Sequence, residues 1–301
     1  MRRSTTLTGL VGLGALAVVV AVPTAQQNRA QIEQVKDNLY LINGGRAAPG
    51  SQSTTAVFVT MNGVVVVDTN VPGWGQAILD QIRSVTDKPV TMIINTHTHG
   101  DHVGSNAEFP ASVEVVAHEN TKTSMASMRM FQGESARYLP GRTFSDRMSL
   151  FEGEDQIDLY YFGRAHTNGD TIVAFPFLRA AHTGDLYACN CAPLVSRGGN
   201  SLDYAETLQR AVAGLPEIDT IMPGHSDVTD WQAFVDYGTF NRDLLAAVRQ
   251  AFADGLTAEE TADSIGADAR FAAYALAPFG STGQMGGITR LVSQMYSELR
   301  R

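Results

Sequence analysis

The sequence predicts a mixed α/β domain, and three observations indicate this class. Short runs of β-branched and apolar residues alternate along the chain with segments of helical spacing. Asn62 and Gly63 separate two of these runs, which is a strong hairpin signal because both residues tolerate positive φ. Hydrophobic residues make up 44% of the 301 residues, which is enough for one large core or two modest domains.

The expected elements follow in chain order. Strands are predicted over residues 38–42, 54–60, 64–68, 90–94, 113–117, 143–151, 156–162, 171–175 and 219–222. Helices are predicted over residues 75–85, 119–131 and 201–213 and from Trp231 onward, with Ser201 as an N-cap. The run at 90–94 is apolar, as in a strand that is buried on both faces.

The N-terminal residues predict export. Arg2 and Arg3 precede an apolar stretch over residues 7–22, and small residues follow up to Ala25. We therefore expect a signal peptide over residues 1–25 and a periplasmic or secreted protein, with an uncleaved membrane anchor as the alternative. No later segment is long and apolar enough to span a bilayer, so no stable membrane insertion is expected after cleavage.

Charge and cysteine content restrict the class of partner. The formal net charge is -9, and no basic stripe is present to neutralise phosphates, so nucleic acid is not expected as a partner. A small-molecule substrate is expected instead. Cys189 and Cys191 are separated by a single residue, so they form either a strained disulfide or two free thiols.

The segment THTHGDH at residues 96–102 concentrates metal-binding side chains directly after the apolar strand. His97 and His99 project to the same side of an extended loop, and Gly100 allows a turn before Asp101 and His102. The four side chains can therefore serve two centres, one pair for each ion. Imidazole and carboxylate donors together suit zinc.

Five ordered motifs make the chain resemble the metallo-β-lactamase superfamily over about residues 38–226. They are VVVVDT with Asp68, THTHGDH, AHTNGD with His166, HTGDLY with Asp185, and PGH with His225. The resemblance implies an αββα sandwich as a hydrolase domain over residues 30–227, with a helical C-terminal segment over residues 228–301 packed on the same domain.

The resemblance also implies the site and its cofactor. His97, His99 and His166 would hold one zinc ion, and Asp101, His102 and His225 would hold a second, so that each chain carries two. Asp185 would bridge the ions, and Asp68 would orient a ligand by hydrogen bonds unless it is an ordinary strand-end aspartate. Metal-bound hydroxide would attack the substrate, with Asp101 as the catalytic group that accepts or shuttles the proton.

Departures from family patterns narrow the substrate. Asp185 stands where zinc β-lactamases have Cys or Ser, and Ala188 stands where one subclass has a substrate-binding Lys, so β-lactam hydrolysis is doubtful. A small ester, lactone or amide is expected instead. Tyr187 and His182 are candidate substrate contacts, and His182 is alternatively a satisfied buried histidine.

Two other interpretations of function stay open. A mononuclear iron oxidoreductase of the same fold, resembling dioxygenases, is the main alternative, and a non-catalytic metal-binding protein is the third. Two features outside the motifs are also ambiguous. The segment Met125–Phe131 forms either a flexible apolar lip or a packed helix face. The stripe with Ile288, Leu291, Val292 and Met295 either covers the sandwich or forms a homo-oligomer face.

Overall fold

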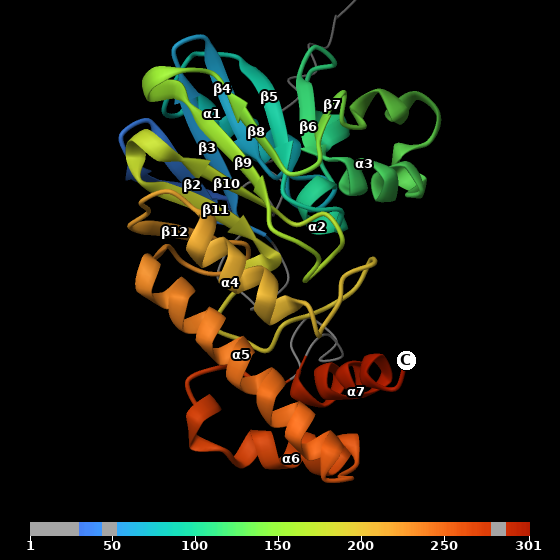
Figure 1. Ribbon diagram of the computed structural model, residues 1–301. Coiled ribbons are helices and arrows are strands. Elements are labelled where there is room, and N and C mark those ends of the chain that lie inside the picture. Colours follow the sequence, from blue (N-terminus) through green and yellow to red (C-terminus); the bar gives the residue numbers. More distant parts are fainter. Residues whose placement is uncertain (1–29, 44–52, 278–286) are drawn as a thin grey trace, which may run out of the picture.

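The computed structural model describes residues 30–43, 53–277 and 287–301, and it contains two β-sheets (Figure 1). The predicted signal peptide lies outside the described residues. The first sheet has the order β1-β2-β3-β4-β5-β6-β7, and the second has the order β13-β12-β11-β10-β9-β8. The strands of the first are β1 (Gln31–Lys36), β2 (Leu39–Asn43), β3 (Thr55–Thr60), β4 (Gly63–Val67), β5 (Val90–Asn95), β6 (Glu114–His118) and β7 (Arg142–Phe144). Those of the second are β8 (Arg147–Leu150), β9 (Ile157–Tyr161), β10 (Thr171–Phe175), β11 (Ala180–Gly184), β12 (Thr220–Pro223) and β13 (Thr229–Asp230).

The two sheets pack face to face. Alternate side chains of each strand point to opposite faces of its sheet, so one set lies between the sheets and the other faces outward. On β4, Val65 and Val67 join the core between the sheets, whereas Val64 and Val66 face outward. On β10, Val173 likewise points into the core between the sheets, and Ile172 faces outward. Both sheets therefore bury both of their faces, which explains why their central strands are almost continuously apolar.

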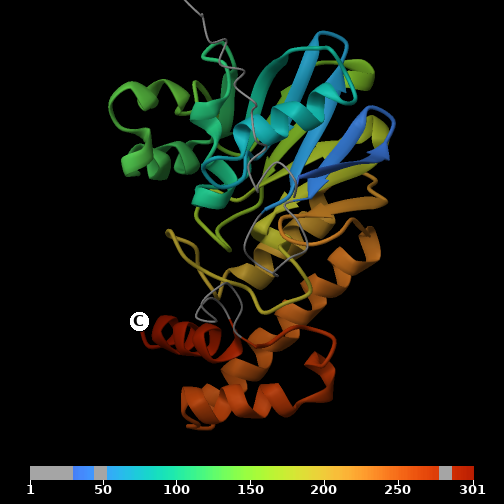
Figure 2. The ribbon, with the colours of Figure 1, turned by 180° about the vertical axis from the view of Figure 1, so that it is seen from behind.

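Helices cover the two outer faces, so the predicted αββα sandwich is confirmed (Figures 1 and 2). Outside the first sheet lies α1 (Gly75–Arg83), whose buried Ile78 and Ile82 pack on the β4 valines. The short helix α2 (Gly100–Val103) follows β5, and α3 (Glu119–Ala126) lies at the β6–β7 edge. Outside the second sheet lie α4 (Tyr204–Gly214) and α5 (Trp231–Ala253).

The C-terminal part of the chain is helical, as predicted. It comprises α5, α6 (Ala258–Ala267) and α7 (Ile288–Leu299). A capping box forms between Thr257 and Glu260 at the start of α6. The predicted α7 stripe is buried in the same apolar cluster as Leu208 of α4 and Leu244 of α5. This stripe therefore covers the chain's own core instead of forming a free face. In the described ranges, no helix has both the length and the hydropathy to cross a membrane.

Several expected elements differ in the structure. Strands β1, β11 and β13 were not predicted, and the single strand predicted over residues 143–151 is divided into β7 of the first sheet and β8 of the second. The 119–131 helix ends at Ala126 before a short 3-10 turn at Arg129–Phe131. Met125 and Phe131 are buried beside Val103, so this segment packs in a small core instead of forming a lip. Ser201 is not an N-cap, because α4 begins at Tyr204 and both the Ser201 N–H and its hydroxyl donate to Glu298 of α7.

A buried carboxylate between β8 and β9 gives a testable contribution to stability. Asp158 accepts a hydrogen bond from Ser149 Oγ at 2.5 Å and one from Arg147 Nη2 at 2.9 Å. Burial raises the pKa of Asp158, but the hydrogen bonds from Ser149 and Gln156 and the charge of Arg147 outweigh it, so the net shift is downward. A lowered folded-state pKa means that the ionised carboxylate stabilises the fold above the unfolded-state pKa of about 4. This stabilisation is lost as the pH falls through the folded-state pKa.

We therefore expect Asp158→Asn to lower the free energy of unfolding by about 1–2 kcal/mol at pH 7, with a smaller difference from the parent protein below about pH 4. Urea unfolding at both pH values measures this. Asp263→Asn, at an exposed position of α6, serves as a matched control and should change stability by less than about 0.5 kcal/mol. A loss that is equal at both pH values would show that the charge of Asp158 is not the cause.

Candidate metal centre

Seven His and Asp side chains converge at one edge of the sandwich, where several strands end. Strands β4 and β5 run parallel, as do β11 and β12, so the carboxyl ends of each pair meet at a common edge. The candidate ligands follow β5, β9, β11 and β12, and Asp68 follows β4. The sheets hold these loops rigidly, which is the usual setting of a catalytic site.

Three imidazoles form the first group. His97 Nε2 lies 3.1 Å from His99 Nδ1 and 3.2 Å from His166 Nε2, and the His99 and His166 atoms are 2.8 Å apart. Tetrahedral zinc with Zn–N bonds of about 2.0–2.1 Å requires nitrogens about 3.3 Å apart. The three inward nitrogens are therefore spaced closely enough to share one cation.

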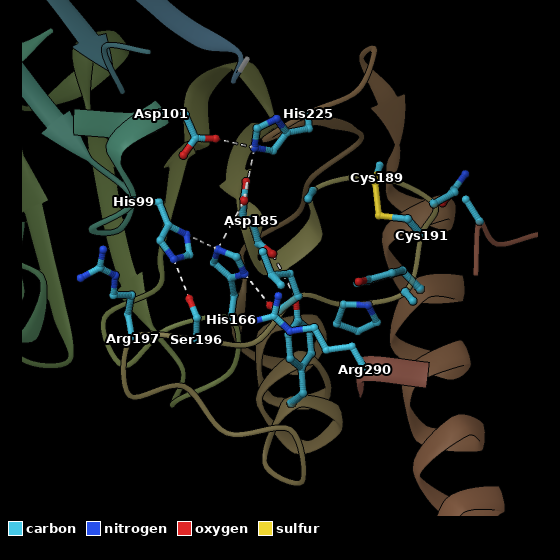
Figure 3. A pocket seen from close by; sticks show the side chains of 18 of the residues that line it. His99, Asp101, His166, Asp185, Cys189, Cys191, Ser196, Arg197, His225 and Arg290 are labelled. Atoms are coloured by element: carbon cyan, nitrogen blue, oxygen red, sulfur yellow. Dashed lines mark hydrogen bonds and ion pairs between the residues drawn. A yellow bond between two sulfur atoms is a disulfide. The ribbon is translucent and has the colours of Figure 1, made fainter. Parts of the chain in front are cut away.

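Hydrogen bonds on the outer side fix how these rings are oriented. His166 Nδ1 donates to the Leu194 carbonyl at 2.6 Å, and His99 Nε2 lies 2.7 Å from Ser196 Oγ (Figure 3). A hydrogen bond on one ring nitrogen leaves the other to bind a metal and sets its direction. The outer partners thus turn His166 Nε2 and His99 Nδ1 toward the shared point.

Asp101, His102 and His225 form the second group. His225 Nε2 lies 3.2 Å from Asp101 Oδ2 and 3.3 Å from His102 Nε2. His102 and Asp101 are brought together by α2, which begins at Gly100 and turns the chain away from the extended loop of His97 and His99. Two imidazoles and one carboxylate are a donor set that suits zinc.

Asp185 lies between the two groups. Its Oδ2 is 3.3 Å from His166 Nε2 in the first group and 3.3 Å from His225 Nε2 in the second. Its Oδ1 is buried without a well-formed hydrogen bond, 3.3 Å from His102 Nε2. A buried carboxylate oxygen with unsatisfied acceptor capacity among imidazole nitrogens fits a cation. The seven side chains therefore have donor types and spacings that fit divalent cations, with Asp185 between the two groups.

Burial and charge act differently on the two groups. Burial lowers the pKa of His97, and it lowers the pKa of His99 to about 3, so both rings are neutral at pH 7 and present lone pairs. Burial also acts to lower the pKa of His225, but the charge of Asp185 and the hydrogen bond that His225 donates to Asp101 outweigh it and raise the pKa to about 10. The same negative potential that favours a proton on His225 favours a metal cation there.

Asp68 supports the centre from behind. Its Oδ2 accepts hydrogen bonds from Thr96 Oγ1 at 2.7 Å and from His102 Nδ1 at 2.7 Å, and its Oδ1 accepts one from Thr96 N at 2.8 Å. With both oxygens occupied in this way, Asp68 orients His102 and the loop after β5. The structure therefore gives Asp68 an orienting position and not that of an isolated strand-end aspartate.

Neither of the two candidate substrate contacts lines the pocket that opens onto the centre. His182 is buried: it accepts a hydrogen bond from Gly184 N through Nδ1, and its Nε2 lies 3.1 Å from Thr54 Oγ1. Tyr187 is also buried and donates its hydroxyl to Asn190. Both side chains are satisfied within the protein, so the structure does not place either against a substrate.

A pocket of about 410 Å³ opens onto the centre and is lined by His99, Asp101, His166, Asp185 and His225. Cys189 and Cys191, which are joined by a disulfide, line another side (Figure 3). Tyr204, Tyr237 and Arg290 also line the pocket, and none of these three was predicted. They come from α4, α5 and α7, so only the packing of these helices brings them to the site.

An αββα sandwich with a cluster of His and Asp ligands at one edge defines a class of metallo-hydrolases. Residues 48–225 match the family model of the metallo-beta-lactamase superfamily, and the chain belongs to that superfamily. It is accordingly a metal-dependent hydrolase.

Two individual proteins are similar to this chain in sequence. The metallo-beta-lactamase type 2 of Elizabethkingia meningoseptica is 27% identical over 233 residues, which are 75% of this chain and 87% of that protein. The 2,4-dinitroanisole O-demethylase subunit alpha of Nocardioides sp. is 34% identical over 145 residues, covering 44% of this chain and 42% of that subunit.

Solved structures show the same fold. The metallo-beta-lactamase from Pontibacter korlensis matches with a TM-score of 0.59 and 18% identity, over 71% of this chain and 99% of that one. The DIM-1 metallo-beta-lactamase matches with a TM-score of 0.57 and 19% identity, over 71% of this chain and 98% of that one. Residues beyond the family match include α5, α6 and α7.

Proposed function

We propose that this chain is an exported dinuclear zinc hydrolase that cleaves a small ester, lactone or amide. The position of Asp185 carries the proposal, because its carboxylate lies 3.3 Å from an imidazole of each ligand group. A single divalent ion would leave one of the two groups without a role. When bound, two zinc ions would supply Lewis-acid polarisation of the scissile carbonyl and a water acidified enough to attack it at neutral pH.

The residues of the chain have separate tasks in this reaction. The hydrogen bonds from the imidazoles to Leu194, Ser196 and Asp68 keep the donor atoms fixed while charge develops on the substrate. The Asp101 side chain lines the pocket and has 29% of its surface exposed, compared with 9% for Asp185. We assign Asp101 as the group that accepts the proton and transfers it toward the leaving group.

Two observations support export. The first 25 residues have the composition of a signal peptide, and the Cys189–Cys191 disulfide is typical of an oxidising compartment. A periplasmic or secreted location follows from the proposal. Such a location also argues against substrates that are confined to the cytoplasm.

Metal content and turnover, measured together, test the proposal. Zinc, iron and manganese per chain would be quantified by mass spectrometry. Hydrolysis of esters, lactones, thioesters, phosphodiesters and β-lactams would be assayed with and without chelator. The names of the two relatives make β-lactams and 2,4-dinitroanisole necessary members of the panel.

We expect about two zinc ions per chain and turnover of an ester, lactone or amide that chelator abolishes and added zinc restores. One iron per chain without hydrolysis would overturn the dinuclear mechanism. It would favour the alternative, a mononuclear iron oxidoreductase of the same fold.

A further inference from the structure

We propose that Arg290 recognises an anionic group of the substrate, so that the preferred substrate is an ester, lactone or amide with an apolar body and a carboxylate. This inference rests on the proposed function, because it places the carboxylate on a substrate that is bound at the metal centre. Arg290 belongs to the first turn of α7, well beyond the residues that match the family model.

The position of Arg290 supports this role. Its side chain lines the same pocket as His166 and Asp185, and Figure 3 shows it extending from α7 toward the side where His166 lies. Arg197 also lines the pocket, but its side chain lies beyond His99 and turns away from the ligand cluster. Arg290 is therefore the cation best placed to contact a group bound beside the ligands.

The charge environment leaves the Arg290 guanidinium available. Within the described ranges, Arg290 forms no ion pair with a carboxylate, although arginines such as Arg164 and Arg179 do, with Asp203 and Glu217. Among the described residues that line the pocket, the carboxylates are those of the candidate ligands Asp101 and Asp185. An unpaired guanidinium in a chain of net charge -9 is suited to bind a substrate carboxylate, because its planar donors match that group.

The surrounding wall indicates the rest of the substrate. Ala188, Ala192, Pro193, Leu194 and Ala275 give the pocket a largely apolar lining. Because the residue three positions after Asp185 is Ala188, the wall that follows the bridging ligand offers no cation. Arg290, which reaches the pocket from α7, supplies the positive charge that this part of the wall lacks.

The backbone of Arg290 is held in place, which reduces the cost of ordering it. Its neighbours Ile288 and Leu291 are buried, and Ile288 N donates to the Leu276 carbonyl at 2.8 Å. At the other end of α7, Glu298 accepts hydrogen bonds from Ser201 N at 3.0 Å and Ser201 Oγ at 2.6 Å. Such preorganisation lets a charge-assisted contact contribute to affinity.

Binding of paired probes to the zinc-loaded protein tests the inference. The probes are hydroxamates with two to five methylene groups that end either in a carboxylate or in the matching primary amide. Hydroxamates are preferred to thiols, because a thiol could exchange with the Cys189–Cys191 disulfide. Dissociation constants would be measured by calorimetry for the parent protein, Arg290→Gln, Arg290→Lys and Arg249→Gln. Arg249 is an exposed α5 residue that does not line the pocket and serves as the matched control.

We expect Arg290→Gln to weaken binding of the best carboxylate probe about tenfold or more while amide binding stays within about twofold, which also shows that the variant is folded. Arg290→Lys should recover part of the preference, and Arg249→Gln should keep all of it. An equal loss for both probes, or no loss, would overturn the role of Arg290 while leaving the hydrolase intact. If the parent protein holds no zinc and binds neither probe, the proposed function and this inference both fail.

Discussion

Replacing Asp185 with asparagine is expected to leave about one tightly bound zinc ion per chain and to lower turnover by well over a hundredfold. Even residues that only orient a metal ligand change metal affinity or activity by about 10–100-fold. The Asp185 carboxylate is closer to the ions than that, since it lies 3.3 Å from an imidazole of each ligand group. Asparagine keeps the shape but loses the negative charge and one acceptor oxygen. Zinc content after dialysis and turnover of the best substrate would be measured on the same preparation.

Asp68→Asn provides a graded comparison for this result. Asp68 holds His102 through a hydrogen bond of 2.7 Å but has both oxygens occupied by protein donors. We expect the Asp68→Asn substitution to weaken zinc binding about 10–100-fold, while two zinc ions still bind at high zinc concentration. Two tightly bound ions in Asp185→Asn would contradict the bridging role. Loss of one ion in Asp68→Asn at saturating zinc would contradict the orienting role.

Gly224→Ala is expected to reduce zinc binding and turnover almost as strongly as Asp185→Asn, although glycine binds no metal. A Cβ atom at position 224 would lie 2.1 Å from Asp185 Oδ1 and 2.8 Å from the Gly184 carbonyl oxygen. The backbone cannot easily move away, because Gly224 N donates to the Gly184 carbonyl at 3.0 Å and β12 is paired with β11. The bridging carboxylate must therefore shift, and we expect zinc affinity to fall at least about tenfold and turnover with it.

The matched control is Gly100→Ala. Gly100 stands between the candidate ligands His99 and Asp101, yet a Cβ atom there meets nothing within 4 Å. It begins α2, where alanine is well tolerated. We expect this variant to keep its zinc and most of its turnover, as measured by the same zinc titration. Equal damage in both variants would show that steric contact with Asp185 is not the reason for glycine at position 224.

The fold could be predicted where the local pattern and the tertiary environment agree. The Asn62-Gly63 hairpin and the apolar run before His97 are found as β3–β4 and β5, because strands buried on both faces are apolar throughout. β1 could not be predicted, since an edge strand with the sequence QIEQVK is mostly solvated. β11 was also missed, because AAHTG combines small residues with a histidine and a threonine whose hydrogen bonds depend on the fold.

The candidate site likewise contains some residues that the sequence predicts and others that it does not. The spacing of His97, His99, Asp101 and His102 in one motif after β5 indicates metal chemistry by itself. His166, Asp185 and His225 were predicted because their motifs resemble those of the superfamily. The pocket walls carry no such signal. Tyr204 donates its hydroxyl to the carbonyl groups of Asp185 and Leu186, and Arg290 reaches the pocket from α7, but each relation depends on how distant helices pack. Nothing in the local sequence of either residue distinguishes it from an ordinary helical position.

The attachment of α7 has a consequence for how this enzyme could acquire new substrates. The ligands lie between residues 97 and 225, whereas Arg290 lies on a helix that is fixed to the sandwich by its buried stripe and by Glu298. Chemistry and selectivity are thus encoded in separable parts of the gene. A mutant library confined to the exposed positions of α7, with the stripe and Glu298 unchanged, would vary substrate preference while every candidate metal ligand stays as it is. Substitutions in α7 can therefore change the substrate preference of this hydrolase, both in laboratory evolution and in nature.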